Sequence, residues 1–261
     1  MNLRTKGLRR SVPRASAALL LLGALGACSR SARHDGGSDP RELSDQLSAD
    51  YAATWEHHRL RFALTTDDPQ DQGAANGVAD LANDALDYVS ADADSHLEIR
   101  LIGHTEYAKG ALADPALAGR WLLGPKSQTD ARSTLAKLLP MPAALKKSLA
   151  TSANSVRRVG EAAADHGVPV TAYEWTAAPA IAAAAHIPSG AILTIEMDVG
   201  ADHLVRQLKL SVVSHSSPGP ADASPRVPSG VATLRLSDFD AVPSITPPSD
   251  ALTPAELGVQ G

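Results

Sequence analysis

Apolar and polar residues alternate in short segments over most of the 261-residue chain. A period of two places the apolar side chains on one face of an extended strand and the polar ones on the other. The clearest segments lie at 60–64, 97–101, 193–199, 204–212 and 231–236. Short turns that suit hairpins follow or join several strands, at 103–104, 164–167 and 200–202. The pattern predicts about ten strands, joined by hairpins, in one antiparallel sheet.

Two segments have helical rather than strand spacing. Asp39 can cap a helix that has Pro40 at its first position, and apolar residues then recur at four-residue steps, which predicts a helix over 40–55. Residues 127–153 predict a second helical segment that two prolines break once. Strands joined by hairpins, together with these helices, predict an α+β domain over 39–250 whose sheet curls over its helices.

The first 27 residues have the layout of a secretory signal. A basic stretch from Arg4 to Arg14 precedes an apolar run from Ala15 to Ala27. A helix that spans a bilayer needs about 20 residues, so this shorter run is predicted to be cleaved and not retained as an anchor. The pair Arg9-Arg10 leaves twin-arginine export open beside the general secretory route.

Cys28 is the single cysteine of the chain, and it directly follows this run. Leu25-Gly26-Ala27-Cys28 resembles the bacterial lipobox, which implies cleavage between Ala27 and Cys28 and diacylation of the cysteine sulfur. A plain signal peptide with an accidental cysteine is the alternative. Two or three acyl chains hold a protein lastingly on a bilayer. We therefore expect a lipid-anchored protein on the outer face of the cell membrane.

The rest of the chain divides by composition. Residues 28–38 combine the acylated cysteine with a small, polar segment that is typical of a flexible tether. The folded domain is expected over 39–250, and residues 251–261 are expected to be a C-terminal tail. No internal repeat is present in the sequence.

Charge and motif content exclude several classes of function. The chain has 24 Lys and Arg against 29 Asp and Glu, and cleavage after Ala27 leaves 19 bases against those acids. An acidic body with nine aromatic residues argues against a nucleic-acid partner. Because no nucleophile elbow, phosphate loop or metal-ligand spacing is present, we expect no enzyme activity, no cofactor and no metal site.

The order of the segments resembles the LolA-like actinobacterial lipoproteins of the LppX and LprG type. The resemblance runs from about Pro40 to Asp250, and its pieces are HRLRFALTT, SVRRVGEAAADHGVPVTAYEW, IEMDVGADHLVRQLKLSV and LSDFDAVPSITPPSD. The resemblance rests on the order of these pieces together with the lipobox. The resemblance implies a half-open antiparallel β-barrel with helices covering its concave face and an apolar cavity for acyl chains.

The apolar strand faces and the resemblance together give a candidate cavity lining. A carrier of acyl chains needs an apolar cavity of adequate width and no reactive group. The alanine-rich, aromatic-poor composition could leave such a cavity open, but genomic base bias explains the same composition. The candidate lining residues are Leu60, Phe62, Leu64, Leu97, Ile99, Leu101, Leu193, Ile195, Met197, Leu208, Leu210 and Val212.

Two functions fit these features. The first is an envelope lipoprotein that binds or carries lipid or glycolipid, with an envelope protein or transporter as a further partner. The second is a protein-binding or sensor module that uses the same fold without carrying lipid. Charge, length and lipobox suit both, so the sequence leaves the choice open.

Overall fold

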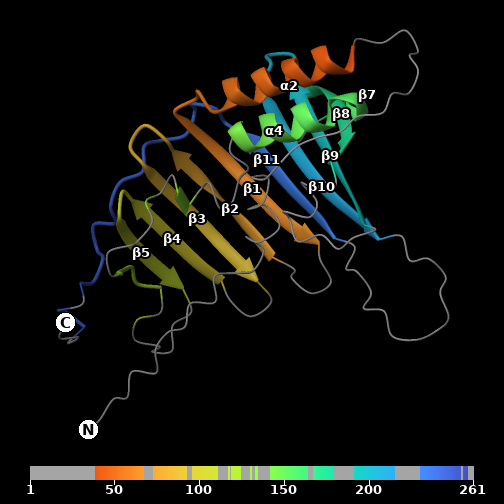
Figure 1. Ribbon diagram of the computed structural model, residues 1–261. Coiled ribbons are helices and arrows are strands. Elements are labelled where there is room, and N and C mark those ends of the chain that lie inside the picture. The colour runs from red at the N-terminus through yellow and green to blue at the C-terminus, as the bar shows by residue number, and fades with distance from the viewer. Residues whose placement is uncertain are drawn as a thin grey trace, which may run out of the picture.

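One antiparallel sheet of eleven strands carries two helices on one of its faces (Figure 1). The structure is a computed structural model. It describes residues 39–67, 73–92, 96–110, 117, 119–124, 130, 133–134, 142–163, 167–178, 191–214, 230–253 and 255–257. The strands are β1 (Arg59–Asp67), β2 (Gly73–Asp80), β3 (Ala85–Asp92), β4 (His96–Ile102), β5 (Thr105–Gly110), β6 (Leu122–Leu123), β7 (Arg157–Ala163), β8 (Pro169–Thr176), β9 (Ala191–Gly200), β10 (Val205–Ser214) and β11 (Val231–Ser237).

The strand order shows how the chain builds this sheet. The order is β6-β5-β4-β3-β2-β1-β11-β10-β9-β8-β7, so two meanders meet where the first strand pairs with the last. All ten neighbouring pairs are antiparallel. β6 and β7 are the two edges, and they do not pair with each other, so the sheet is open. The predicted half-open antiparallel architecture is confirmed.

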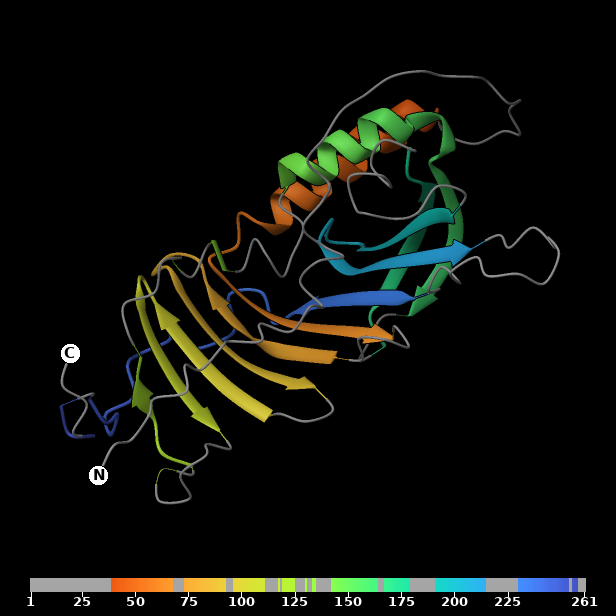
Figure 2. The same ribbon diagram turned by 60° about the horizontal axis from the view of Figure 1, so that its bottom comes forward.

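The helices α2 (Pro40–Thr54) and α4 (Pro142–Ser152) pack against each other on the concave face. The Asp39 side chain accepts a hydrogen bond of 2.9 Å from the backbone N–H of Arg41, and Pro40 occupies the first turn, as the sequence predicts. Figure 2 shows both helices over the β8–β10 part of the sheet, with β2–β5 extending away from them. A short 3₁₀ turn, η2 (Ala153–Ser155), leads from α4 into β7.

The second helical segment begins where a proline allows it to begin. Of the predicted range 127–153, the structure describes helix at 133–134 and from Pro142 onwards. Proline has no N–H to donate and fits a first turn, so a helix that starts at Pro142 agrees with the predicted break. The other residues of that range lie outside the described part. In the ranges the structure describes, no helix has the length and apolar character to cross a membrane.

After β11 the chain returns across the outer face of the sheet. The backbone N–H of Asp240 donates to the carbonyl of Arg59 at 2.7 Å, and Arg100 donates to the carbonyl of Thr246 at 2.8 Å. Leu252 then bridges to Leu122 of β6. Leu252 lies beyond the domain boundary predicted at residue 250, and that boundary stays a prediction.

Candidate functional site

The register of the strands brings all twelve candidate lining residues to the concave face. On one side of β1, Leu60 lies opposite Ala79 of β2, which lies opposite Leu86 of β3, and Leu86 lies opposite Leu101 of β4. On the other side, Leu64 lies opposite Leu234 of β11. Opposed residues point to the same face of a sheet. The same relation extends to β10 and β9 through the pairs Leu234–Leu208, Leu208–Met197, Leu210–Ile195 and Val212–Leu193.

Burial divides these twelve residues into two groups. Nine are buried in one core cluster: Leu60, Phe62, Leu64, Leu101, Leu193, Ile195, Met197, Leu208 and Leu210. Leu97, Ile99 and Val212 are partly exposed. The first group is packed as in an ordinary protein core, and the second leaves apolar surface accessible on the same face. We call the concave surface formed by all twelve the apolar face.

The helices supply core residues that the strand pattern did not place on the apolar face. Leu47 and Tyr51 of α2 and Leu145 and Leu149 of α4 have at most 1% of their surface exposed. Burial raises the pKa of the Tyr51 hydroxyl, so Tyr51 is neutral at physiological pH. The helical spacing of these residues was visible in the sequence, but it did not say which part of the sheet they would cover.

Small residues of β2 were also missed. Ala75, Gly77 and Ala79 lie opposite Leu64, Phe62 and Leu60 on the apolar face. A Cβ atom added to Gly77 would lie 2.2 Å from the backbone oxygen of Asp87. A glycine is therefore needed for β2 and β3 to approach this closely. The signal was present as GAANGVA, but it lacks the large residues that mark a strand face.

The β3–β5 part of the apolar face is the less buried part. Ile99 of β4 lies opposite Tyr88 of β3 and Ala108 of β5, and Leu97 lies two residues before Ile99 on the same face of β4. All four residues are partly exposed. Figure 2 places these strands away from α2 and α4. We call these four residues the open patch. Partly exposed large apolar side chains that lie together on a concave surface can accept an apolar ligand.

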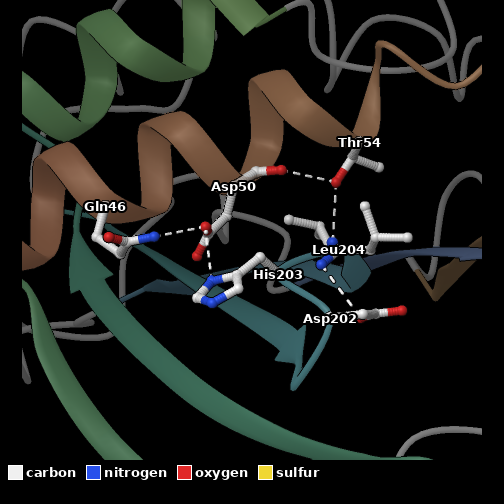
Figure 3. Close-up of polar contacts among 7 residues, drawn as sticks. Gln46, Asp50, Thr54, Asp202, His203 and Leu204 are labelled. Carbon is white, nitrogen blue, oxygen red and sulfur yellow. Dashed lines mark hydrogen bonds and ion pairs between the residues drawn. The ribbon is translucent and has the colours of Figure 1, made fainter.

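A polar cluster joins α2 to the turn between β9 and β10 (Figure 3). The Thr54 hydroxyl accepts a hydrogen bond of 2.9 Å from the backbone N–H of Val205, the first residue of β10. The buried Asp50 carboxylate lies 3.2 Å from Nδ1 of His203 and accepts a 2.6 Å hydrogen bond from Gln46. His203 has a φ of 63°, which is uncommon for a residue with a side chain. The turn conformation thus directs this imidazole toward the helix.

The segment DHLVR of the sequence forms this turn, and its other charged residues stabilise it locally. Asp202 forms an ion pair with Arg206, whose guanidinium lies 4.9 Å from the centre of the Phe239 ring. The Asp202 carboxylate also folds back over Gly200, where an added Cβ atom would lie 2.5 Å from it. The DHLVR segment, which the family resemblance includes, therefore connects the β9–β10 hairpin to α2 and to the end of β11. Its contacts are structural.

The remaining site predictions have no structural test. Ala27 and Cys28 lie outside the described residues, so cleavage and lipidation stay predictions. Within the part of the chain that the structure describes, no group of three or more His, Cys, Asp or Glu residues is placed to hold a metal ion.

Neither a protein-family model nor a curated protein matches the sequence. Solved structures match the fold. The lipoprotein LppX of Mycobacterium tuberculosis superposes with a TM-score of 0.53 at 15% identity, over 80% of this chain and 100% of that one. The chain has the LolA-like fold of LppX. The resemblance to LppX-type proteins that the sequence indicated is thus confirmed for the fold.

Two further matches superpose less well. A chain of the Pseudomonas aeruginosa MucA/MucB complex gives a TM-score of 0.30 at 13% identity, over 86% of this chain and 61% of that one. A DUF1329 family protein from Desulfovibrio piger gives 0.23 at 8% identity, over 79% and 96%. Similarity at this level shows the fold and leaves the function to the residues of the apolar face.

Proposed function

We propose that this protein is an envelope lipoprotein that binds the acyl chains of lipids or glycolipids on the apolar face of its open sheet. The observation that carries the proposal is the open patch. In an ordinary core, Leu97, Ile99 and Tyr88 would be buried as fully as Leu60 and Leu86 are. In this structure these three side chains are partly exposed. An acyl chain that covers such a surface gains about 0.8 kcal/mol for each buried methylene without any directional bond.

Anchoring is the second part of the proposal. Acylation of Cys28 would hold the domain on the outer face of the cell membrane, within reach of its ligand. The ten residues 29–38 between Cys28 and the cap of α2 span at most about 35 Å when extended. An anchored domain can therefore meet lipids of its own bilayer without leaving it.

Native mass spectrometry of the mature protein, purified from its own membranes, tests lipid binding. We expect a mass excess over the lipidated chain that organic extraction removes, and fatty-acid-containing molecules in the extract. Delipidated protein should then regain mass when it is mixed with phospholipid or glycolipid. Protein that carries no lipid and takes up neither class would contradict the proposal and would favour the protein-binding module.

A further inference from the structure

Helix α2 is attached to the sheet by buried polar contacts as well as by its apolar side. Thr54 is fully buried, and its hydroxyl accepts from the backbone of Val205 while donating to the carbonyl of Asp50 at 2.8 Å. The Asp50 carboxylate meets His203 beside it (Figure 3). Both contacts join the same turn, between β9 and β10, to the C-terminal half of the helix.

Helix α4 has equivalent attachments to β8 and to the residues that directly follow it. The indole N–H of the buried Trp175 lies 3.4 Å from the hydroxyl of Ser148, to which it donates. The backbone N–H of Ala178 donates to the hydroxyl of Ser152 at 3.0 Å. The two serines are buried, so the helix is fixed at two successive turns.

The apolar contacts of the helices add to these attachments. Leu47, Tyr51, Leu145 and Leu149 belong to the same core cluster as the buried residues of β1, β9 and β10. Lifting either helix would expose large side chains that are now fully buried and would break its hydrogen bonds to the sheet in one step. Movement of the helices is therefore a costly route to the apolar face.

The open patch needs no such movement. Tyr88, Leu97, Ile99 and Ala108 are already partly exposed, and the neighbouring β2 contributes Gly77 and two alanines instead of large side chains. Phe62 and Tyr88 lie on either side of Gly77. An acyl chain laid here would contact apolar atoms of three strands without displacing a helix.

From these contacts we infer that α2 and α4 form a fixed roof, and that acyl chains enter and leave over the open patch on β3–β5. The inference rests on the proposed lipid binding and assigns its place. The occupant is a lipid acyl chain, because the four side chains of the open patch offer an extended apolar surface with only the Tyr88 hydroxyl as a polar side-chain group.

A covalent lock on the roof tests the first half of the inference. The variant Asp50→Cys/His203→Cys replaces the polar contact by two thiols. Oxidation to a disulfide, or a short bis-methanethiosulfonate linker that forms a disulfide with each thiol, can join them, and a reductant cleaves both links. The full mature chain is anchored in phosphatidylcholine vesicles, and its transfer of pyrene-labelled phospholipid from donor vesicles is measured above the protein-free background. We expect the locked and the reduced variant to transfer at rates within about twofold of each other. Wild type given the same treatment has no thiol when Cys28 is acylated, so it controls for effects of the reagent that do not depend on the lock.

A blocked patch tests the second half. Ile99→Trp should slow transfer by about tenfold at unchanged melting temperature, because the indole occupies partly exposed space. Val89→Trp, on the outer face of the neighbouring strand, is the matched control and should transfer like wild type. If Ile99→Trp does not fold, Ala108→Phe on β5 blocks the same patch and replaces it.

The outcomes separate the inference from the function on which it rests. Transfer that stops in the locked variant and returns on reduction would overturn the fixed roof. A folded Ile99→Trp or Ala108→Phe protein with wild-type transfer would overturn the open patch as the point of exchange. Wild-type protein that transfers no lipid above background would overturn the proposed function together with the inference.

Discussion

Asp198 is a carboxyl that the fold keeps away from water. It lies on β9 with 6% of its surface exposed, where Oδ2 accepts from Gln207 at 2.9 Å and Oδ1 has no partner among the described residues. Burial, and then the carboxylate of Glu196, raise the pKa of Asp198. The folded protein therefore binds this proton at a higher pH than the unfolded chain does. Ionised Asp198 thus destabilises the fold at neutral pH.

The variant Asp198→Asn should be more stable than wild type at pH 7, because the amide keeps the acceptor for Gln207 and carries no charge. The difference should shrink as the pH falls through the raised pKa and vanish below about pH 4, where both states of wild type are protonated. Melting curves between pH 3 and pH 8 measure it. A variant less stable than wild type at pH 7 would show that the carboxylate has a favourable partner there.

Asp240 has the opposite surroundings. Its carboxylate lies 2.8 Å from Nδ1 of His57 and accepts from the backbone N–H groups of His58 and Arg59 at 2.9 and 3.0 Å. The hydrogen bond with His57, followed by that from the backbone of Arg59, lowers the pKa of Asp240. Its stabilising contribution is complete above the ordinary pKa of an aspartate and is lost as the pH falls through the lowered value.

We expect Asp240→Asn to lower the melting temperature at pH 7 and to approach wild type in strong acid. The same pH series measures both aspartates, and each variant controls for the other because the expected signs are opposite. Equal shifts of the same sign at pH 7 would mean that surroundings do not decide the effect.

Gly77 decides how closely two strands pair. An alanine Cβ would lie 2.2 Å from the Asp87 oxygen and 2.6 Å from Cα of Tyr88. Because backbone atoms must shift, Gly77→Ala should reduce the free energy of unfolding by about 1–3 kcal/mol. Gly124→Ala is the control, since its nearest contact would be 3.3 Å and a small adjustment accommodates it. Urea unfolding of the two variants compares them, and equal losses would contradict the steric argument.

At the scale of the elements, the roof depends on hydrogen bonds between side chains of the helices and the backbone of the sheet. Thr54→Val removes the acceptor of the Val205 N–H and leaves that buried donor without a partner, which costs about 1–3 kcal/mol. Thr54→Ser keeps the hydroxyl and should lose less. Urea unfolding measures both free energies, and amide exchange of α2 locates the change. Equal losses would mean that the methyl group, and not the hydroxyl, holds the helix.

The helices cover one part of the apolar face. Each fully buried leucine of α2 and α4 contributes about 1.5–3 kcal/mol, so the cover over β8–β10 is a large part of the stability of a domain. The described helices are short, and Figure 2 shows that they do not extend over β3–β5. A sheet of eleven strands is too wide for two helices of this length to cover.

At the scale of the whole molecule, Cys28 should determine where the protein resides. Cys28→Ala removes the sulfur that would be acylated, so we expect an uncleaved precursor without fatty-acid labelling. Ser29→Ala, one residue further on, should be processed and labelled like wild type. Metabolic labelling and the mass of the mature protein measure both. Equal labelling of the two variants would exclude this lipidation.

The sequence alone determined most of the strands and which side of each of them is apolar, but it did not predict the short strand β6. A period of two is a local property, and it identified the strands that carry Leu60, Leu97, Leu193 and Leu208. The turn at 200–202 identified the hairpin that joins the last two. The alternation was weaker for β2, where GAANGVA has few large residues, although pairing with β1 and β3 makes it a strand. The resemblance added the LolA-like fold, which superposition on LppX confirms.

Only the tertiary structure decided how the twelve apolar residues divide. Leu97 and Leu193 both lie in segments where apolar and polar residues alternate, yet Leu97 is partly exposed and Leu193 is buried. Leu193 lies on β9, in the part of the sheet that α2 and α4 cover, and the position of these helices is fixed by contacts between distant segments such as Thr54 with Val205. Spacing along a chain reports which face a side chain occupies, whereas its burial depends on what the rest of the chain places above it.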